Sequence, residues 1–295
     1  IAGLVKGASK GEGLGNQFLS NIRLTDAICH VVRCFDDADI THVEGSVDPI
    51  RDIEIINLEL IMADLQTIEN RLGKIERKAM TNKDKDALHE VATLKKLQEA
   101  FEAGKPARSV ELDEDELAML KAFSLLTLKP MIYVANMSEE EISDPQANVY
   151  YQRVKELADS EHNQVVAVCA RIEEELSSLE PEEKKVFLND LGIAESGLDR
   201  VIKAAYNILD LCTFLTAGED ECRAWTFRKG MLAPQCAGVI HTDFEKGFIR
   251  AECYKFEDID ALESEQAIKE AGKLRLEGKD YVVQDGDVLH FRFNV

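Results

Sequence analysis

The sequence lacks the features that mark several common classes of protein. No uninterrupted apolar run reaches the roughly 18 residues that a membrane-spanning helix needs. The first residues are rich in glycine and lack the charged start and apolar stretch of a signal peptide. The seven cysteines form no C-x-x-C pair, and their odd number and irregular spacing favour free thiols over a zinc site or a disulfide framework. Free thiols indicate a reducing compartment, so we expect a cytoplasmic protein.

Basic residues are also scarce. The 35 Lys and Arg residues oppose 56 Asp and Glu residues, which gives a formal net charge of −21. Broad, sequence-independent binding of nucleic acid needs a basic face, so this charge argues against it but leaves room for one local basic patch. Apolar residues make up 45% of the 295 residues, which is enough for a folded chain of two or three domains.

A regular apolar pattern predicts a helical hairpin between residues 50 and 125. The spacing alternates between three and four residues, which is the pattern of helices that wind around each other. A polar break at Thr81–Asp84 separates the two helices, and Gly104–Pro106 ends the second. The pattern comprises Leu58, Ile61, Leu65, Ile68, Leu72 and Ile75, followed by Leu88, Val91, Leu94, Leu97 and Phe101.

Strand-like segments flank the hairpin. Residues 27–35, 130–134 and 164–169 are short apolar runs, and a helix predicted over residues 145–160 separates the last two. Two buried strands joined by a helix indicate a βαβ unit and a parallel sheet. We therefore expect residues 1–49 and 126–210 to form one α/β domain, into which the hairpin is inserted.

Residues 211–295 have a different pattern, which predicts a small α+β domain. Turns that contain glycine, such as Asp285–Asp287, separate its elements. The predicted strands lie around residues 223–227, 239–241, 248–254 and 289–293, and a helix is predicted near residues 261–276.

Three short segments carry residues suited to binding a nucleotide. Five glycines among residues 3–15 make a loop that can bring backbone N–H groups close to an anion, although a mobile tail has the same composition. Asn136–Glu139 directly follow a predicted strand, where open α/β sheets bind their ligands. Asn136 offers a donor and an acceptor for a base edge, whereas a helix start capped by Ser138 is the alternative interpretation. Residues 169–170 end the next predicted strand.

The order of these three segments resembles the YchF/Obg-like ATPase family, a branch of the P-loop NTPases. The resemblance implies an α/β fold with a P-loop NTPase-type parallel sheet, an inserted α-helical hairpin (a coiled coil) and a C-terminal ubiquitin-like β-grasp domain of the TGS type. It also implies a ribosome-associated switch protein that binds and hydrolyses ATP. The matching segments run in order along the whole chain: Ile1–Asn21, Thr41–Asp52, Thr213–Gly218, Arg223–Thr226, Ala233–Gln235, His241–Arg250 and Lys279–Val295.

The phosphate-binding motif of that family, G-x-x-x-x-G-K-[ST], occurs nowhere in the sequence. Its lysine holds the β- and γ-phosphates, and its hydroxyl holds Mg²⁺. The resemblance therefore implies that the P-loop and the Mg²⁺ ligands lie in an N-terminal segment missing from this chain. We expect the chain alone to be inactive and to hold no metal. Either it is a fragment or its N-terminal portion lies before the first visible residue; the second is favoured, because a start inside a nucleotide site would leave a bare sheet edge.

The resemblance assigns roles to matching residues. Gly3 would sense the γ-phosphate, and His42 would activate the attacking water, because Leu4 replaces the water-orienting glutamine of related GTPases. Guanine-specific relatives carry N-K-x-D, whereas Met137 and Glu139 stand here for its lysine and aspartate, which favours ATP over GTP. Met137 is expected to stack on the base. The full sets are Gly7, Gly11, Gly13 and Gly15 in the switch loop, and Gly3, Asn136, Met137, Glu139, Cys169 and Ala170 at the nucleotide.

The C-terminal domain, with the hairpin, is the candidate for contact with RNA or the ribosome. Residues 211–255 hold six acids and six bases, so this stretch is neutral within an acidic chain. Its bases could contact phosphate while Trp225 or Phe244 stacks on a nucleobase; ordinary solubilising charge is the alternative. The candidate bases are Arg223, Arg228, Lys229, Lys246 and Arg250.

Two other functions stay open: an Obg-type switch that binds GTP, and a non-enzymatic RNA- or ribosome-binding module.

Overall fold

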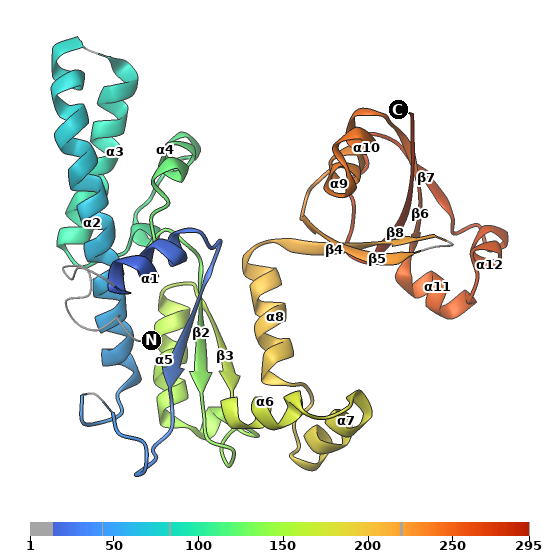
Figure 1. The fold of residues 1–295 in the computed structure, drawn as a ribbon, viewed down its shortest axis with the longest axis horizontal. Coiled ribbons are helices and arrows are strands. Elements are labelled where there is room, and N and C mark those ends of the chain that lie inside the picture. Colours follow the sequence, from blue (N-terminus) through green and yellow to red (C-terminus); the bar gives the residue numbers. More distant parts are fainter. Residues whose placement is uncertain (1–13, 43, 83, 219–220, 295) are drawn as a thin grey trace. The chain divides into compact units, whose positions relative to one another are not determined.

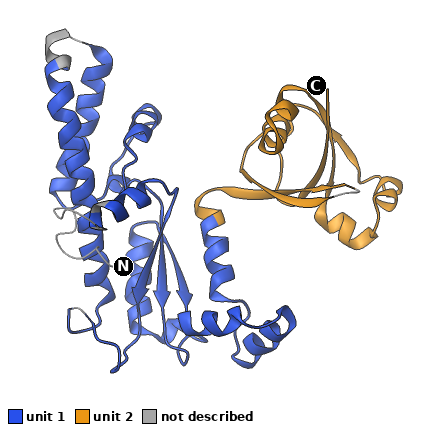
Figure 2. Cartoon of the chain, in the orientation of Figure 1, with its two compact units in different colours: residues 1–205 blue, residues 206–295 orange. Residues whose placement is uncertain are grey.

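The computed structural model describes residues 14–42, 44–82, 84–218 and 221–294. The chain divides into two compact units, residues 1–205 and residues 206–295 (Figure 2). Each unit has its own apolar core. No helix among the described residues is both long and apolar enough to cross a lipid bilayer.

A three-stranded parallel sheet forms the centre of the first unit (Figure 1). Its strands, in spatial order, are β1 (Ile28–Arg33), β2 (Met131–Asn136) and β3 (Gln164–Val168). The first five side chains of β2 are all buried, which explains why this strand reads as an uninterrupted apolar run. Helix α5 (Val149–Ser160) connects β2 to β3, so the predicted βαβ unit is confirmed.

The predicted hairpin consists of α2 (Pro49–Asn82) and α3 (Lys85–Glu102). Asp84 begins α3 by accepting hydrogen bonds from the N–H groups of Asp86 and Ala87. Most of the predicted apolar stripe is buried between the two helices. Its buried members are Ile61, Ile68, Leu72, Ile75, Leu94, Leu97 and Phe101.

Two leucines of the predicted stripe are not buried. Leu58 is 49% exposed and Leu88 is 46% exposed. Ile61 is the first residue of α2 in the apolar cluster shared with α3, so Leu58 lies about one turn before that contact begins. Near the other end of the pair, Ala87 takes the buried position beside Leu88. Both predictions of burial are therefore wrong: Leu58 lies before the contact between the helices begins, and Ala87 instead of Leu88 faces α2.

One buried carboxylate fastens the hairpin to the sheet. Asp64 of α2 is fully buried. Its two oxygens accept hydrogen bonds from the backbone N–H groups of Leu126 and Thr127 and from the Thr127 hydroxyl, at 2.8–2.9 Å. Burial raises the pKa of the Asp64 carboxyl, and these donors oppose the rise. Because Leu126 and Thr127 lead into β2, the contact fixes the base of the hairpin against the sheet.

The remaining helices of the first unit are short. Helix α1 (Leu14–Arg23) packs through Leu19 into the core of the sheet. Helix α4 (Glu114–Leu120) follows the hairpin, and a 3-10 turn extends it to Phe123. After β3 the chain forms α6 (Ala170–Ser177), α7 (Pro181–Asp190) and α8 (Gly197–Ile208).

The second unit is built on a mixed five-stranded sheet. Its elements are β4 (Leu211–Ala217), β5 (Cys222–Arg228), α9 (Ala233–Ile240), α10 (Thr242–Lys246), β6 (Phe248–Lys255), α11 (Phe256–Leu262), α12 (Glu265–Glu270), β7 (Arg275–Glu277) and β8 (Asp287–Phe293). The strand order is β5-β4-β8-β6-β7, with β4 and β8 parallel and the other pairs antiparallel. One face packs on α9 and the other on α11 and α12. The predicted fold class, an α/β chain with a parallel sheet and a second sheet domain, is confirmed.

Some predictions for the second unit are wrong. Residues 239–241, predicted as a strand, form the end of α9 and the residue after it; α9 buries Cys236 and Ala237 in the core. The helix predicted near residues 261–276 is interrupted. Glu263 adopts a left-handed conformation (φ 60°) at the end of α11, and Gly272 (φ 68°) turns the chain toward β7. Strand β4 was not among the predicted elements.

Candidate functional site

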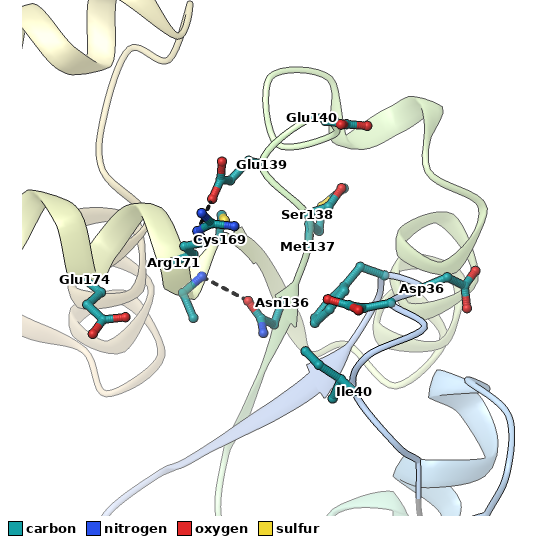
Figure 3. Close-up of a pocket in the computed structure, with 13 residues that line it drawn as sticks. Asp36, Ile40, Asn136, Met137, Ser138, Glu139, Glu140, Cys169, Arg171 and Glu174 are labelled. Carbon is teal, nitrogen blue, oxygen red and sulfur yellow. Dashed lines mark hydrogen bonds and ion pairs between the residues drawn. The ribbon is translucent and has the colours of Figure 1, made fainter.

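A cavity of about 490 Å³ lies at the carboxyl edge of the parallel sheet (Figure 3). Its walls come from the segments that follow β1, β2 and β3 and from the start of α6. The structure thus brings together five predicted site residues: Asn136, Met137, Glu139, Cys169 and Ala170. The rest of the lining is Phe35, Asp36, Asp37, Ile40, Ser138, Glu140, Arg171 and Glu174.

The register of the strands explains why these segments meet. Arg33 of β1 pairs with Asn136 of β2, which pairs with Val168 of β3. The ladder continues one residue further, because the Cys34 N–H donates to the Asn136 carbonyl and the Met137 N–H donates to the Val168 carbonyl, each at 2.8 Å. Parallel strands end at the same edge of a sheet, so the residues after each strand face one space.

Asn136 is held in place by the start of α6. Its side-chain oxygen accepts a hydrogen bond from the Ala170 N–H at 3.0 Å (Figure 3). This bond orients the amide group. It uses neither of the two N–H donors of the NH₂ group, and the oxygen keeps a second lone pair. Asn136 can therefore still offer a donor and an acceptor to a ligand, as its sequence position predicted.

Glu139 is paired with a residue that sequence reasoning missed. Its Oε1 lies 2.7 Å from the Nε of Arg171 (Figure 3). The two side chains are 41% and 75% exposed, so water screens the pair and it contributes little stability. The Glu139 carboxylate, expected to accept from a base amino group, is thus engaged with a guanidinium. The position of Arg171, directly after Cys169 and Ala170, was the signal that could have identified it.

Met137 and Cys169 line the cavity with nearly covered side chains. Met137 is 2% exposed and Cys169 is 4% exposed, and both belong to the core of the first unit. A side chain packed into the core presents no open face to a base. The stacking role expected of Met137 therefore needs correction: in this structure its side chain supports the cavity floor from within the core.

The cavity carries an excess of acidic groups. Arg171 is the one basic residue of its described lining, which also includes five carboxylates: Asp36, Asp37, Glu139, Glu140 and Glu174. Carboxylates repel phosphate groups at short range. The cavity is therefore suited to the uncharged, hydrogen-bonding part of a nucleotide, its base, rather than to the phosphates.

His42 lies outside the cavity lining, although Ile40, two residues earlier, is part of it. Its Nδ1 accepts a hydrogen bond from the Glu44 N–H at 3.2 Å, so its Nε2 carries the proton and donates to Asp52 at 2.9 Å. Both ring nitrogens are engaged. Asp52, in the first turn of α2, is a second residue that sequence reasoning missed; it holds the ring in one tautomer.

The predicted switch loop can be assessed only at its last residue. Gly3, Gly7, Gly11 and Gly13 lie outside the described residues. Gly15 is the second residue of α1, so this part of the prediction needs correction: the loop does not extend to Gly15. The physical reason is the amphipathic segment that follows, which buries Leu19 in the core and favours a helix from Leu14 onward.

The basic candidates of the second unit do not form one surface. All five are exposed, and they lie on β5, the turn after it, α10 and β6. Arg223 and Arg228 are five positions apart on β5, so they point to opposite faces of the sheet. Arg250 lies opposite Arg292 on the neighbouring strand β8. Lys229 and Lys246 complete the set.

The two aromatic candidates of the second unit already have ring partners. The Trp225 ring stacks on Phe214, and the Arg223 guanidinium lies 4.2 Å from the Trp225 ring. The Phe244 ring stacks on Phe293 with centroids 3.8 Å apart. Base stacking on either ring therefore requires one of these partners to move, which weakens the predicted stacking.

Within the described part of the chain, no group of three or more His, Cys, Asp or Glu residues is arranged to hold a metal ion. Mg²⁺ bound with a nucleotide takes most of its ligands from phosphates and water and only one or two from carboxylates. The described residues thus hold no preformed three-ligand cage for it.

Comparison with known proteins gives consistent results over the chain. Residues 211–294 match the family YchF-GTPase_C, whose description reads "Protein of unknown function (DUF933)". The "Ribosome-binding ATPase YchF" of Bacillus subtilis is 61% identical over 295 residues, which are 100% of this chain and 80% of that protein. The protein of the same name from Haemophilus influenzae is 54% identical with the same coverage. A solved structure, "Structure of the Schizosaccharomyces pombe YchF GTPase", matches with a TM-score of 0.84 and 40% identity, covering 99% of this chain and 78% of that one.

Proposed function

Because the chain belongs to the YchF family, we propose that it is part of an ATP-binding and ATP-hydrolysing switch protein that acts on the ribosome. The observation that carries this proposal is the orientation of Asn136. Its amide is fixed by the Ala170 N–H at the rim of a cavity large enough for a base, where parallel α/β sheets bind ligands. Ribosome association implies the cytoplasm as its location.

The donors and acceptors at the cavity favour adenine over guanine. The Asn136 NH₂ group can donate to N7 of adenine, and the second lone pair of its oxygen can accept from the N6 amino group. Guanine needs a carboxylate that accepts from N1 and N2 together. Glu139 supplies the carboxylate, but it is longer than the aspartate of guanine-specific relatives and is engaged with Arg171. We therefore propose ATP as the nucleotide.

The phosphates would lie away from the acidic lining of the cavity. Mg²⁺ bound with them would neutralise the charge that develops during phosphoryl transfer. The described residues would bind and orient the base. Among them, we propose Asn136, Glu139, Cys169 and Ala170 for this role, with Met137 beneath them.

We keep His42 as the proposed residue that activates the attacking water. Asp52 accepts a hydrogen bond from the Nε2–H group of His42, so Nδ1 is the acceptor atom of the ring. In the structure this face is occupied by the Glu44 N–H at 3.2 Å. Exchange of this N–H for a water molecule would give Nδ1 the position of a general base.

Competition binding on the full-length protein tests the nucleotide assignment. ATP should displace a fluorescent ATP analogue at a concentration at least about tenfold below GTP, which corresponds to about 1.4 kcal/mol. A tenfold preference for GTP would instead support the GTP-binding alternative, which is favoured by the description of the S. pombe relative as a GTPase. Sedimentation with ribosomes, with and without ATP, tests the second half of the proposal. Ribosome binding without nucleotide binding would support the non-enzymatic module.

A further inference from the structure

The loop after β1 forms one wall of the candidate cavity. Strand β1 lies beside β2 on the side opposite β3, so this loop and the start of α6 stand on opposite sides of Asn136 (Figure 3). The shape of the loop therefore sets how far the cavity extends on the β1 side. The loop comprises residues 34–40, and its lining members are Phe35, Asp36, Asp37 and Ile40.

The side chain of Arg33, the last residue of β1, binds the backbone of this loop. Its Nε donates to the Phe35 carbonyl at 3.1 Å, its Nη1 to the Ile40 carbonyl at 3.1 Å and its Nη2 to the Asp37 carbonyl at 3.3 Å. All three nitrogen atoms of one guanidinium group thus bind carbonyl oxygens of the same loop. The loop is therefore folded around this group.

The arrangement suits the planar guanidinium group of an arginine. The three carbonyls belong to residues two, four and seven positions after Arg33. Arginine presents five donors in a rigid fork, whereas lysine carries one compact ammonium group on a flexible stem. The Phe35 ring also lies against the guanidinium group, whose carbon is 4.8 Å from the ring centroid. A lysine at this position could satisfy only part of these contacts.

Two contacts with the start of α5 hold the first half of the loop from its other side. The Asn148 side-chain NH₂ group donates to the Cys34 carbonyl at 3.0 Å, and the Tyr150 hydroxyl donates to the Asp36 carboxylate at 2.9 Å. The bonds from Arg33 to Asp37 and Ile40 reach the second half. Arg33 is therefore the contact that fixes the loop along its whole length.

Arg33 influences the cavity through the loop alone. It is not among the described residues that line the cavity. His42, two residues beyond the loop, is fixed separately, because Asp52 and the Glu44 N–H bind its two ring nitrogens. Loss of the Arg33 side chain should therefore disturb the wall of the cavity and leave His42 in place.

We propose that Arg33 is a positioning residue of the nucleotide site, which holds residues 34–40 in the shape that accepts the base of ATP. The inference rests on the proposed function, which places the base in this cavity. A loop that already has its bound shape loses little conformational freedom when the ligand binds, and this preorganisation raises affinity. A merely structural role for Arg33 would instead lower stability and leave the affinity of the folded protein for ATP unchanged.

Arg33→Met in the full-length protein tests the proposal, because methionine keeps an apolar stem and removes the donors. The matched control is Arg108→Met, which removes a guanidinium group from the opposite edge of the same sheet. There Arg108 binds the Thr127 carbonyl and the Glu161 carboxylate, just before β2 and β3 begin. Each variant is compared with the wild type in three measurements at a temperature well below its unfolding transition. These are hydrogen–deuterium exchange of residues 34–40 without nucleotide, the Kd for ATP, and KM and kcat for ATP hydrolysis.

The proposal predicts a specific pattern for Arg33→Met. Residues 34–40 should exchange at least about threefold faster. The Kd and KM for ATP should rise about tenfold, while kcat stays within about threefold of the wild type, because His42 keeps its own partners. Arg33→Lys should lie between the two, since an ammonium group restores part of the bonds. Arg108→Met should leave loop exchange and KM within about twofold of the wild type, even where it lowers the unfolding temperature further.

Four results would overturn the proposal: an unchanged Kd in Arg33→Met, faster loop exchange without a change in KM, a loss confined to kcat, or an equal rise in KM in the control. The wild type separates this inference from the proposed function. If it binds neither ATP nor GTP, the proposed function fails, and loop exchange still shows whether Arg33 holds the loop. If it binds ATP and Arg33→Met binds ATP equally well, only the role of Arg33 fails.

Discussion

The polar groups around the buried Asp287 of the second unit and those at the cavity of the first unit are satisfied differently. In the second unit, Asp287 is fully buried and its partners enclose it: the Tyr281 hydroxyl and the Gln284 N–H donate to it at 2.8 Å, and the Lys255 ammonium lies 2.8 Å away. In the first unit, the polar groups that follow the strands open onto a cavity, and Asn136 keeps donors unused by its bond to Ala170. An enclosed network stabilises a fold, whereas an open one can bind a ligand.

The largest expected effect tests the enclosed network around Asp287. Asp287→Ala should lower the free energy of unfolding of the second unit by about 3–5 kcal/mol, because the buried donors of Tyr281 and Gln284 lose their acceptor. Denaturant unfolding followed by the fluorescence of Trp225, the single tryptophan of the chain, measures it. Asp280→Ala, at an exposed position, is the control and should change stability by less than about 0.5 kcal/mol.

The affinity for ATP should be the same in both of these variants and in the wild type. Loss of ATP binding in Asp287→Ala, at a denaturant concentration where the first unit stays folded, would contradict a purely stabilising role for the Asp287 network. It would mean that the network of the second unit contributes to the nucleotide site.

A second prediction concerns His30, a half-buried residue of β1 whose Nδ1 atom is buried and has no hydrogen-bond partner among the described residues. Burial, with a smaller effect of Arg108, lowers its pKa from 6.5 to about 4. Between those two pH values the unfolded chain binds a proton that the folded chain does not. The stability that neutral His30 confers is therefore complete above pH 6.5 and lost as the pH falls, by about 3 kcal/mol at pH 4.

Comparison of the wild type with His30→Leu isolates this contribution. Unfolding is followed by circular dichroism of the helices between pH 7 and pH 4. The stability of the wild type should fall by about 3 kcal/mol relative to that of His30→Leu between pH 7 and pH 4. Curves that stay parallel over the whole range would show that His30 titrates normally in the folded chain.

His42→Ala tests, through the rate of ATP hydrolysis, whether His42 activates the attacking water. It should reduce ATP turnover by about a hundredfold, which corresponds to about 2.7 kcal/mol, and leave the affinity for ATP within twofold. Asp52→Asn should cause an intermediate loss, because the ring keeps its place but loses the acceptor that fixes its tautomer. Turnover of His42→Ala equal to that of the wild type would remove His42 from the mechanism.

The smallest expected effect concerns recognition of the base. Asn136→Ala should weaken ATP binding by about tenfold, about 1.4 kcal/mol, through the loss of its hydrogen bonds. Ser138→Ala is the matched control, because its hydroxyl also lies at the cavity but donates to Glu141. Isothermal titration of both variants measures the difference. Equal affinities would place the base elsewhere.

The sequence was most informative where one physical rule decides the structure. The uninterrupted apolar runs of β2 and β3 predicted a parallel sheet, and the rule that such sheets bind ligands at their carboxyl edge brought Asn136 and Ala170 to one cavity. The ion pair of Glu139 with Arg171 could not be predicted, because it depends on how the start of α6 is turned relative to the loop after β2. The pair of His42 with Asp52 depends on the loop before α2 in the same way.

Local patterns were less reliable in the second unit. Residues 239–241 are rich in β-branched side chains and suggested a strand, but the burial of Cys236 and Ala237 against the sheet selects a helix. The basic residues of this unit were grouped by their nearness in sequence. The alternation of side chains along β5 places Arg223 and Arg228 on opposite faces of the sheet, so nearness in sequence does not make one surface.

The most direct test of the account is the position of the base in a crystal structure of the full-length protein with a non-hydrolysable ATP analogue. The account predicts adenine in the cavity at the ends of β2 and β3, with the Asn136 side chain in hydrogen-bonding contact with its N7 and N6 edge. Adenine bound outside this cavity, with the Asn136 amide still bonded only to the Ala170 N–H, would contradict it.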